Sequence, residues 1–365
     1  MTGQWFSLFD DWSYTIPYRD RCRDDVQTMK RKRVTLGEVA QTAGVSRATV
    51  SLVVRKSPLV AQHTRDRVEQ VMQDLDYVRD IGAARLRNNS SRTIGVIVPN
   101  LVNPFFTEFL SGAEQVLGEG DRVVLLANSH DDPTRQADIL QRFRGHGVDG
   151  VILCPAQGTD PRLLSRMRDW GLPVVQSLRE VGQDVSDYAG GNYIEGIGLA
   201  VRHLVDQGHR KIAFLSVTAH TSARDERLKG FARALAETGA QDAGVVETEL
   251  TWESAAQAAG KVLALDSKPT AVMCFNDILA AGLMLGLRNA GHEAGRDIAV
   301  VGLDDLALTQ MTHPTLTSVA MHPEKVGAAA ARLLARRLAD PDADLARICI
   351  APDLMVRESS GRNRR

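Results

Sequence analysis

The chain has 365 residues, of which 44% are apolar, so it is long enough to bury cores in more than one domain. Its net charge of −1 conceals a basic region, because residues 30–92 carry 13 Lys and Arg against six Asp and Glu. The sequence has no apolar run of ~18–20 residues, and its four cysteines show no CxxC spacing. These features argue against a membrane protein, a zinc site and a disulfide framework, and the basic region indicates a polyanionic partner.

The first 28 residues are polar and acidic, without the basic start and apolar core of a signal peptide. The ordered pattern begins after Met29, which Lys-Arg-Lys-Arg-Val-Thr-Leu follows. We therefore expect residues 1–33 to be a disordered or mis-assigned leader. Either Met29 is the natural start, or residues 1–30 are disordered.

The stretch VTLGEVAQTAGVSRATVSLVV, residues 34–54, predicts two short helices joined by a tight turn. Thr35 and Ser46 are suited to cap the two helices, and Gly44 stands where left-handed backbone is needed. A third helix is predicted from near Thr64 onward. The apolar positions at helical spacing are Leu36, Val39, Ala40 and Ala43, then Val50, Val53 and Val54, then Val68, Val71, Met72 and Leu75. Three such helices form a helix-turn-helix domain, which we place at residues 34–80.

The outward face of the second helix predicts contacts with duplex DNA. Arg47, Ala48 and Ser51 would reach base edges in the major groove, whereas Ser46 and Thr49 would contact phosphates. The alternative is that Ser46 only caps the helix and that Arg47 is only solvated. The full set of expected DNA-contacting residues is Thr35, Ser46, Arg47, Ala48, Thr49, Ser51, Arg55 and Leu86.

The segments TLGEVAQTAGVSRATVS and TRDRVEQVMQDLDYV resemble the DNA-binding head of the lactose/galactose repressor (LacI/GalR) family. The resemblance extends from Val34 to Ser360. It implies a helix-turn-helix head, a hinge helix, and a two-lobed effector-binding body similar to periplasmic sugar-binding proteins.

Three positions in the head depart from the family pattern. Leu52 replaces an arginine that contacts guanine, and Arg55 stands near a usual asparagine. Leu52 cannot donate a hydrogen bond, so a base contact worth roughly 1–3 kcal/mol is missing or moved to Arg55. Ala61 replaces a serine that usually caps the third helix. The operator is therefore expected to differ from the usual one of the family.

Residues 81–92 are expected to form a hinge, with helix formers up to Arg87 and a polar tether after it. In the family that this chain resembles, the hinge folds on DNA and a leucine enters the minor groove. Leu86 matches that leucine by its spacing from Tyr77. Alternatively, Leu86 packs on its dimer mate. Arg79-Asp80 replaces the Pro-Asn pair of the family at the hinge entry.

From Thr93 onward, apolar strands alternate with helices, which predicts parallel sheets in two doubly wound lobes. The predicted strands are TIGVIVP, VVLLAN, GVILCP, PVVQS, KIAFLS, AVMCF and IAVVGL. The predicted helices are residues 105–117, 135–145, 196–207, 224–237 and 277–290. We place the effector-binding and dimerisation domain at 93–365. Its first lobe comprises about 93–190 and 322–349, and its second about 191–321 and 350–360.

Ligands of such sheets bind beyond the carboxyl ends of strands, where this chain carries amides, carboxylates, an arginine and aromatic rings. By resemblance to the family, the effector-contacting residues are Asn103, Phe105, Phe106, Arg227, Asn276 and Asp304. Either phenylalanine could instead belong to the core, Asn276 could cap a helix, and Asp305 is expected to be structural. Leu178 and Gly191 replace aspartates of many relatives, which leaves a less hydroxylated effector open.

An NAD-dependent oxidoreductase is the main alternative for a doubly wound body. The chain lacks a GxGxxG motif after a strand, and its nearest imitation, GIGLAV at 196–201, falls in a predicted helix. It also lacks a phosphate loop, an HExxH motif and a GxSxG elbow. His130-Asp131-Asp132 precedes Pro133 and is interpreted as a turn. We therefore expect no enzyme activity, no cofactor and no metal. A transport-type sugar receptor fits the body but not the basic head.

The sequence thus predicts a DNA-binding transcriptional regulator, most simply a repressor, in the cytoplasm and associated with the nucleoid. We expect a homodimer on a near-palindromic operator, controlled by a sugar-like effector. A purine or nucleoside acting as corepressor is the alternative effector.

Overall fold

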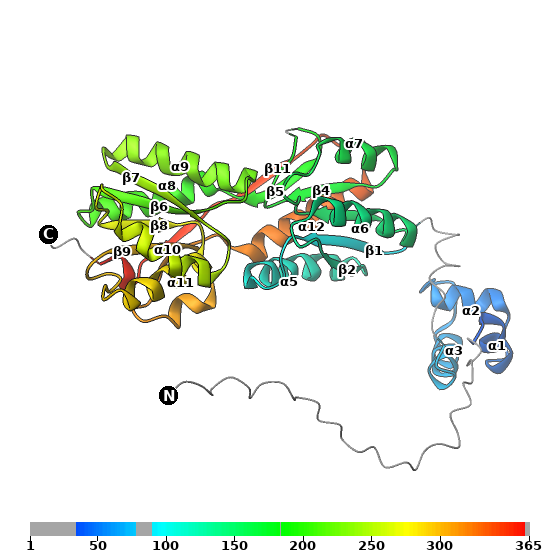
Figure 1. Cartoon of the computed structure of the whole chain (residues 1–365). Coiled ribbons are helices and arrows are strands. Elements are labelled where there is room, and N and C mark those ends of the chain that lie inside the picture. The colour runs from blue at the N-terminus through cyan, green and yellow to red at the C-terminus, as the bar shows by residue number, and fades with distance from the viewer. Residues whose placement is uncertain (1–33, 78–89, 183, 362–365) are drawn as a thin grey trace, which may run out of the picture. The chain divides into compact units, whose positions relative to one another are not determined.

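The computed structural model describes residues 34–77, 90–182 and 184–361. The described residues form two compact units, a small helical head before residue 82 and a larger body after it (Figure 1). The predictions for the leader and for Leu86 in the hinge lie outside the described residues.

The head consists of α1 (Leu36–Thr42), α2 (Arg47–Val54) and α3 (Gln62–Asp74). Thr35 begins α1 with a capping box, since its hydroxyl accepts from Glu38 N at 3.3 Å while the Glu38 carboxylate accepts from Thr35 N at 2.6 Å. Ser46 caps α2 by accepting from Thr49 N at 3.1 Å. Gly44 joins the two helices with φ of 63°, as the turn requires. The helix-turn-helix fold of the head is confirmed.

The head has its own small core. One valine from each helix, Val39, Val50 and Val68, is completely buried. The other members are Ala40, Ala43 and Val53, with Leu36, Val54, Val71, Met72 and Leu75 packed around them. The apolar positions that define the helical spacing in the sequence are thus the positions that pack together.

The start of α3 has no side-chain cap. The helix begins at Gln62, two residues before the predicted entry at Thr64, and Ala61 at the capping position makes no side-chain hydrogen bond. The entry is held instead by Arg65, whose guanidinium donates to Ser57 O at 2.6 Å.

Ala61→Ser is expected to stabilise the head by about 1 kcal/mol, because a serine hydroxyl would accept from a free N–H in the first turn of α3. Hydrogen exchange of the full-length protein should show α3 amides protected about fivefold more strongly. The strands of the body serve as the internal control. Unchanged exchange in α3 would show that its first turn is already satisfied.

The body contains two six-stranded sheets. The first has the order β11-β5-β4-β3-β1-β2, with every neighbouring pair parallel. Its strands are β1 (Thr93–Val98), β2 (Val123–Asn128), β3 (Gly150–Leu153), β4 (Val174–Ser177), β5 (Asp187–Gly191) and β11 (Arg347–Ile350). The second has the order β12-β10-β9-β8-β6-β7, in which β12 alone is antiparallel to its neighbour. Its strands are β6 (Lys211–Val217), β7 (Gln241–Thr248), β8 (Ala271–Cys274), β9 (Ala299–Asp304), β10 (Thr317–Ala320) and β12 (Asp353–Met355).

Helices cover both faces of the first sheet (Figure 1). Ile94 and Val96 of β1 face one core with α5 (Pro104–Glu119) and α12 (Pro323–Ala339), whereas Ile97 faces the other with α6 (Pro133–His146) and α7 (Arg162–Asp169). The second sheet is accompanied by α8 (Tyr193–Asp206), α9 (Ser222–Thr238), α10 (Trp252–Leu263) and α11 (Asp277–Asn289), with short turns at η1 (Ala307–Gln310) and η2 (Glu358–Ser360). The predicted fold class of two doubly wound lobes is confirmed.

The helices α5 and α12 approach each other closely because they meet through glycines. A Cβ on Gly112 would lie 2.0 Å from Glu324 O, and one on Gly327 would lie 1.9 Å from Phe109 O. Any larger residue at either position would push the two helices apart. This contact fixes α5, whose N-terminus carries Asn103 and the two phenylalanines at positions 105 and 106.

The chain crosses between the sheets three times. It crosses from β5 to α8, from β10 to α12, and from β11 to β12. Neither lobe is therefore one continuous segment. The stretch GIGLAV lies inside α8, as predicted, so it cannot form a phosphate-binding turn after a strand.

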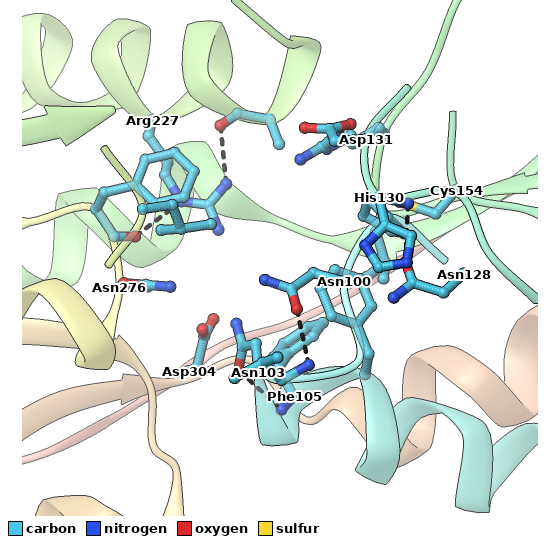
Figure 2. Close-up of a pocket in the computed structure, with 18 of the residues that line it drawn as sticks. Asn100, Asn103, Phe105, Asn128, His130, Asp131, Cys154, Arg227, Asn276 and Asp304 are labelled. Atoms are coloured by element: carbon cyan, nitrogen blue, oxygen red, sulfur yellow. Dashed lines mark hydrogen bonds and ion pairs between the residues drawn. The ribbon is translucent and has the colours of Figure 1, made fainter. Parts of the chain in front are cut away.

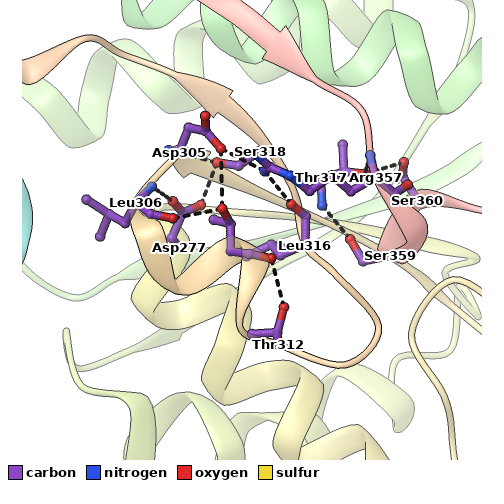
Figure 3. Close-up of polar contacts among 11 residues, drawn as sticks. Asp277, Asp305, Leu306, Thr312, Leu316, Thr317, Ser318, Arg357, Ser359 and Ser360 are labelled. Atoms are coloured by element: carbon purple, nitrogen blue, oxygen red, sulfur yellow. Dashed lines mark hydrogen bonds and ion pairs between the residues drawn. The ribbon is translucent and has the colours of Figure 1, made fainter.

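A buried polar network anchors the carboxyl ends of β8 and β9 (Figure 3). The Asp277 carboxylate, at the start of α11, accepts from Ser318 Oγ at 2.5 Å and from Leu306 N at 2.8 Å. Burial raises the pKa of Asp277 well above its usual range, and the neighbouring Asp304 carboxylate adds to the rise. Asp305 pairs with Arg357 at 2.7 Å. These bonds fix the backbone around Asp304.

Candidate functional site

A cavity of about 340 Å³ opens between the two lobes, at the carboxyl ends of their strands (Figure 2). The residues that line it end or follow β1, β2, β3 and β4 in the first lobe and β7, β8 and β9 in the second, or come from α5, α8 and α9. They are Pro99, Asn100, Val102, Asn103, Phe105, Phe106, Asn128, His130, Asp131, Cys154, Leu178, Arg179, Tyr193, Ala223, Arg227, Leu250, Phe275, Asn276 and Asp304. The structure thus brings all six predicted effector-site residues to one cavity.

Asp304 ends β9 and faces this cavity with a carboxylate that accepts no hydrogen bond from any described residue. Its side chain is only 5% exposed, and its φ of 118° is rare for a residue other than glycine. Burial raises the pKa of Asp304 to about 7; the nearby Arg227 lowers it and Glu108 raises it. A buried, unpartnered carboxylate on strained backbone is costly for the unliganded fold.

Arg227, on α9, is held rigidly between two aromatic rings. Its guanidinium carbon lies 3.9 Å from the ring centroid of Tyr193 and 4.2 Å from that of Phe275. Nε donates to Phe275 O at 3.1 Å, and Nη1 donates to Ala223 O at 2.8 Å. Within the described chain, no carboxylate lies within 4.0 Å of this guanidinium, so its Nη2 is available to a ligand.

Asn276 and Asn103 each combine a capping role with a place in the cavity wall. Asn276 Oδ1 accepts from Leu279 N at 3.0 Å and begins α11, while Asn103 Oδ1 accepts from Phe105 N at 3.0 Å and begins α5. The expectation that Asn276 caps a helix is confirmed, and the cap is also what aims its amide. Tight local turns therefore position both groups.

Phe105 and Phe106 stand at the start of α5 with their rings 5.7 Å apart and nearly perpendicular. Phe105 is 5% exposed and belongs to the core, and Phe106 is partly buried against it. Both also line the cavity. They supply an apolar wall whose ring faces suit flat or C–H-rich ligand surfaces.

Several cavity residues were not predicted, namely Asn100, Asn128, His130, Asp131, Arg179 and Tyr193. Arg179 donates to Asp131 Oδ1 at 2.5 Å. In the predicted turn, Asp132 caps α6 by accepting from Thr134 N at 2.7 Å, and His130 and Asp131 line the cavity. Asn128 and Arg179 stand at or just after a strand end, which is the signal that could have identified them.

The chemistry of the lining gives no sign of metal or thiolate catalysis. Within the described parts of the chain, no cluster of three or more His, Cys, Asp or Glu is arranged to hold a metal ion. Burial raises the pKa of the Cys154 thiol to about 12, so this cysteine is protonated near neutral pH. The other polar groups of the lining are amides, two arginines, an imidazole, a phenol and two carboxylates.

The predicted DNA-contacting residues of the head gather around α2. Ser46, Arg47 and Ala48 are exposed at its N-terminus, and Thr49 and Ser51 are half-buried. Arg55 is exposed and donates to Ser51 Oγ at 2.8 Å, so the two side chains present one combined surface. Thr35 is exposed, with its hydroxyl engaged in the capping box of α1.

Comparison with known proteins matches both parts of this architecture. Residues 35–80 match bacterial regulatory proteins of the lacI family, and residues 201–360 match the periplasmic binding protein-like domain. Over 329 residues the chain is 33% identical to the HTH-type transcriptional repressor PurR of Photobacterium profundum, an alignment that covers 89% of this chain and 98% of that protein. The chain belongs to the LacI family.

Solved structures of LacI-family regulators share the fold. The CelR–cellobiose complex is 30% identical, with a TM-score of 0.67 over 90% of this chain and all of that one. A LacI-family regulator from Enterococcus faecium with bound ribose is 27% identical, with a TM-score of 0.68 over 74% of this chain and all of that one. The Lac repressor dimer bound to operator and the anti-inducer ONPF, 24% identical, supports the fold alone, with a TM-score of 0.82 over 90% of this chain and all of that one.

Membership of the LacI family makes this chain a DNA-binding transcriptional repressor, and its matched relatives are repressors rather than enzymes. The described helices of this LacI-family chain include none that is long and apolar enough to cross a bilayer. The family resemblance identified from the sequence is confirmed.

Proposed function

We propose that the protein binds a near-palindromic operator as a homodimer and that a small-molecule effector between its lobes sets its affinity for that operator. The observation that carries this proposal is Asp304, a buried carboxylate without a partner among the described residues. A ligand hydroxyl or N–H that donates to this carboxylate would offset the cost of burying it. The site therefore lacks a hydrogen-bond donor for Asp304, and a ligand could supply it.

The effector that fits this wall best is a sugar or sugar derivative. Asp304 would accept a hydrogen bond from a hydroxyl, Arg227 and Asn276 would donate, and the rings of Phe105 and Phe106 would contact the C–H face. The cavity volume lies at the small end of known ligand sites, about 300–1,000 Å³, which favours a ligand of one or two rings. The cellobiose and ribose complexes of related regulators support the same class.

A purine or nucleoside acting as corepressor is the second candidate. The observation in its favour is the aromatic wall of Phe105 and Phe106, on which a flat heterocycle can stack. Asp304 would then accept from a ring N–H.

The head at residues 34–80 would contact DNA with α2 in the major groove. Arg47, Ala48 and the paired Ser51 and Arg55 would face base edges. Ser46, Thr49 and Thr35 would position the head on phosphates, and Leu86 in the hinge at 81–92 would enter the minor groove. Such a protein acts in the cytoplasm, on chromosomal DNA.

Effector and operator would be coupled through the body at residues 93–365. Closing the lobes around a ligand would change how two copies meet and thereby how the hinges are presented to DNA. The coupling is reciprocal, so an effector that weakens operator binding must bind less tightly to the DNA-bound form. The edge strand β2 exposes Val123, at 68%, and Leu125, apolar groups that a second copy would cover.

The test is a thermal-shift screen of sugars, sugar acids, sugar phosphates, nucleobases and nucleosides with the full-length protein, followed by gel shift with each hit. The operator would first be selected from random duplexes. A hit is expected to change operator affinity by about 5- to 150-fold, the usual range of allosteric coupling. The proposal fails if no duplex is preferred, or if ligands bind in this cavity without altering operator affinity.

A further inference from the structure

Four asparagines line the cavity, and each has its side-chain oxygen occupied by a backbone N–H of its own turn. Asn100 Oδ1 accepts from Val102 N at 2.7 Å, and Asn128 Oδ1 accepts from His130 N at 2.9 Å. Asn103 and Asn276 make the same kind of bond as helix caps. Because a backbone N–H can only donate, the oxygen of each amide is fixed at that bond and the NH₂ group is directed away from it.

None of these four NH₂ groups donates to another described residue, so all are available to a ligand. Figure 2 shows that the amide nitrogens of Asn100, from the first lobe, and Asn276, from the second, point toward one another across the cleft. Two arginines add further N–H groups. Arg227 has a free Nη2, and Arg179 uses only Nη1, for Asp131 Oδ1 and Pro155 O.

Acceptors are scarce on the same wall. Asp131 Oδ1 already accepts from Arg179 and from Gln157 N at 2.9 Å, so Asp304 is the one lining carboxylate without a hydrogen bond among the described residues. Arg227 is 5% exposed and has no described carboxylate within 4.0 Å. The carboxylate of Asp304 is near enough to interact with Arg227 but makes no ion pair with it. A buried guanidinium that forms no direct ion pair favours a negative ligand group.

We propose that the effector is an anionic, acceptor-rich sugar derivative, a sugar acid or a sugar phosphate, whose oxyanion is bound by these amide and guanidinium donors. One hydroxyl of the same ligand donates to Asp304. A neutral polyol brings an O–H donor with every oxygen, and the side-chain acceptors that this wall offers in return are mainly those of Asp304, Asp131, His130 and Tyr193. The oxygens of an oxyanion only accept hydrogen bonds, and they therefore match the free N–H donors of this wall. The inference depends on the effector site proposed above.

Matched ligand pairs test the charge requirement by calorimetry on the full-length protein. The pairs are D-gluconate with D-glucose, D-galacturonate with D-galactose, D-ribose 5-phosphate with D-ribose, and inosine monophosphate with inosine, with inorganic phosphate as the bare anion. In at least one sugar pair the anion is expected to bind about tenfold or more tightly than its neutral partner, as one or two charge-assisted hydrogen bonds imply.

Three outcomes overturn the inference. If a neutral sugar or inosine binds as well as its anion and changes operator affinity, the donor argument is wrong while the proposed effector site stands. If inorganic phosphate binds as tightly as the best anion, the site does not recognise the sugar. If no ligand binds although the operator is recognised normally, the inference and the proposed effector site both fail.

The variant Asn128→Asp isolates one donor. It keeps an oxygen that accepts from His130 N and replaces the NH₂ donor with a carboxylate oxygen. The affinity for the anion should therefore fall by about tenfold or more, and the affinity for its neutral partner should fall much less. Asn192→Asp is the matched control, because Asn192 Oδ1 also accepts a backbone N–H, from Glu195 at 3.1 Å, but lies outside the cavity. Equal loss for anion and neutral partner contradicts the inference. If Asn128→Asp melts abnormally, Asn100→Asp tests the same point.

Discussion

Asp304→Asn is expected to weaken effector binding by about 10- to 100-fold and leave selection of the operator by the head intact. The substitution keeps size and tolerates the positive φ, since Asn adopts such backbone more readily than most residues. It removes the carboxylate that a ligand donor would meet, and a hydrogen bond to a charged group is worth about 1.5–3 kcal/mol. Calorimetry with the tightest ligand of the screen measures the loss.

Asp305→Asn is the matched control, because Asp305 pairs with Arg357 rather than facing the cavity. It should lower thermal stability and change ligand affinity little. If Asp304→Asn binds ligand as the wild type does, Asp304 is not part of the effector site.

The same carboxylate gives the unliganded protein a pH dependence with a defined sign. The pKa of Asp304 rises from the ordinary 3.8 to about 7, so the folded protein binds an extra proton between these values. The resulting stabilisation is present at low pH and is lost as the pH rises toward and through 7. The melting temperature of Asp304→Asn relative to wild type should therefore increase from pH 5 to pH 8. An equal difference at both pH values would show that Asp304 is not perturbed.

Arg47→Ala is expected to lower affinity for the selected operator by about 10- to 100-fold, because a bidentate base contact carries about 1–3 kcal/mol of discrimination. Arg47 begins α2, is exposed, and stands next to the capping Ser46. Affinity for random duplex should fall much less, so the ratio of specific to non-specific affinity should drop. Fluorescence anisotropy at two salt concentrations measures both affinities.

Arg67→Ala provides the matched control. Arg67 is exposed on α3, and its substitution removes the same charge from the head as Arg47→Ala does. This variant should lower the affinity for the selected operator and for random duplex to a similar, small extent. An equal loss on both DNAs for Arg47→Ala would make Arg47 a phosphate contact.

The strands and helices that could be predicted from the sequence are those with strong local signals. All seven apolar runs of the body form strands. Six of them are largely buried, and strands buried on both faces carry continuous apolar residues. The seventh, the edge strand β2, is partly exposed. The head was predicted because capping residues, Gly44 and the valine spacing agree with one another. Here local preference and tertiary packing favour the same structure.

The missed elements lack those signals for identifiable reasons. β7 and β11 lie at or near the sheet edges and alternate exposed with more buried residues, so they show no apolar run. β5 has the sequence DYAGG, whose small residues are buried without being strongly apolar. The helices α10 and α12 are rich in alanine, which packs closely but gives a weak apolar pattern.

The candidate site was predictable only in part. Asn276 and Asp304 follow apolar strands directly, so the rule for strand ends places them. Arg179 and Asn128 satisfy the same rule. The role of Arg179 depends on Asp131, which lies far from it in the sequence, whereas Asn128 is held by a turn of its own that the sequence did not single out. Tyr193 has no local signal at all, because its role is to hold Arg227 from a different helix.

The three backbone crossings between the sheets also bear on how such proteins can diversify. Each lobe is assembled from separate stretches of the chain. One recombination event between α5 and α12 would therefore leave α12 packed against a foreign α5. A single exchange between residues 77 and 93 divides the chain once and leaves both lobes whole. Operator preference and ligand preference can thus be inherited from different parents, whereas the two halves of the ligand cleft must be inherited together.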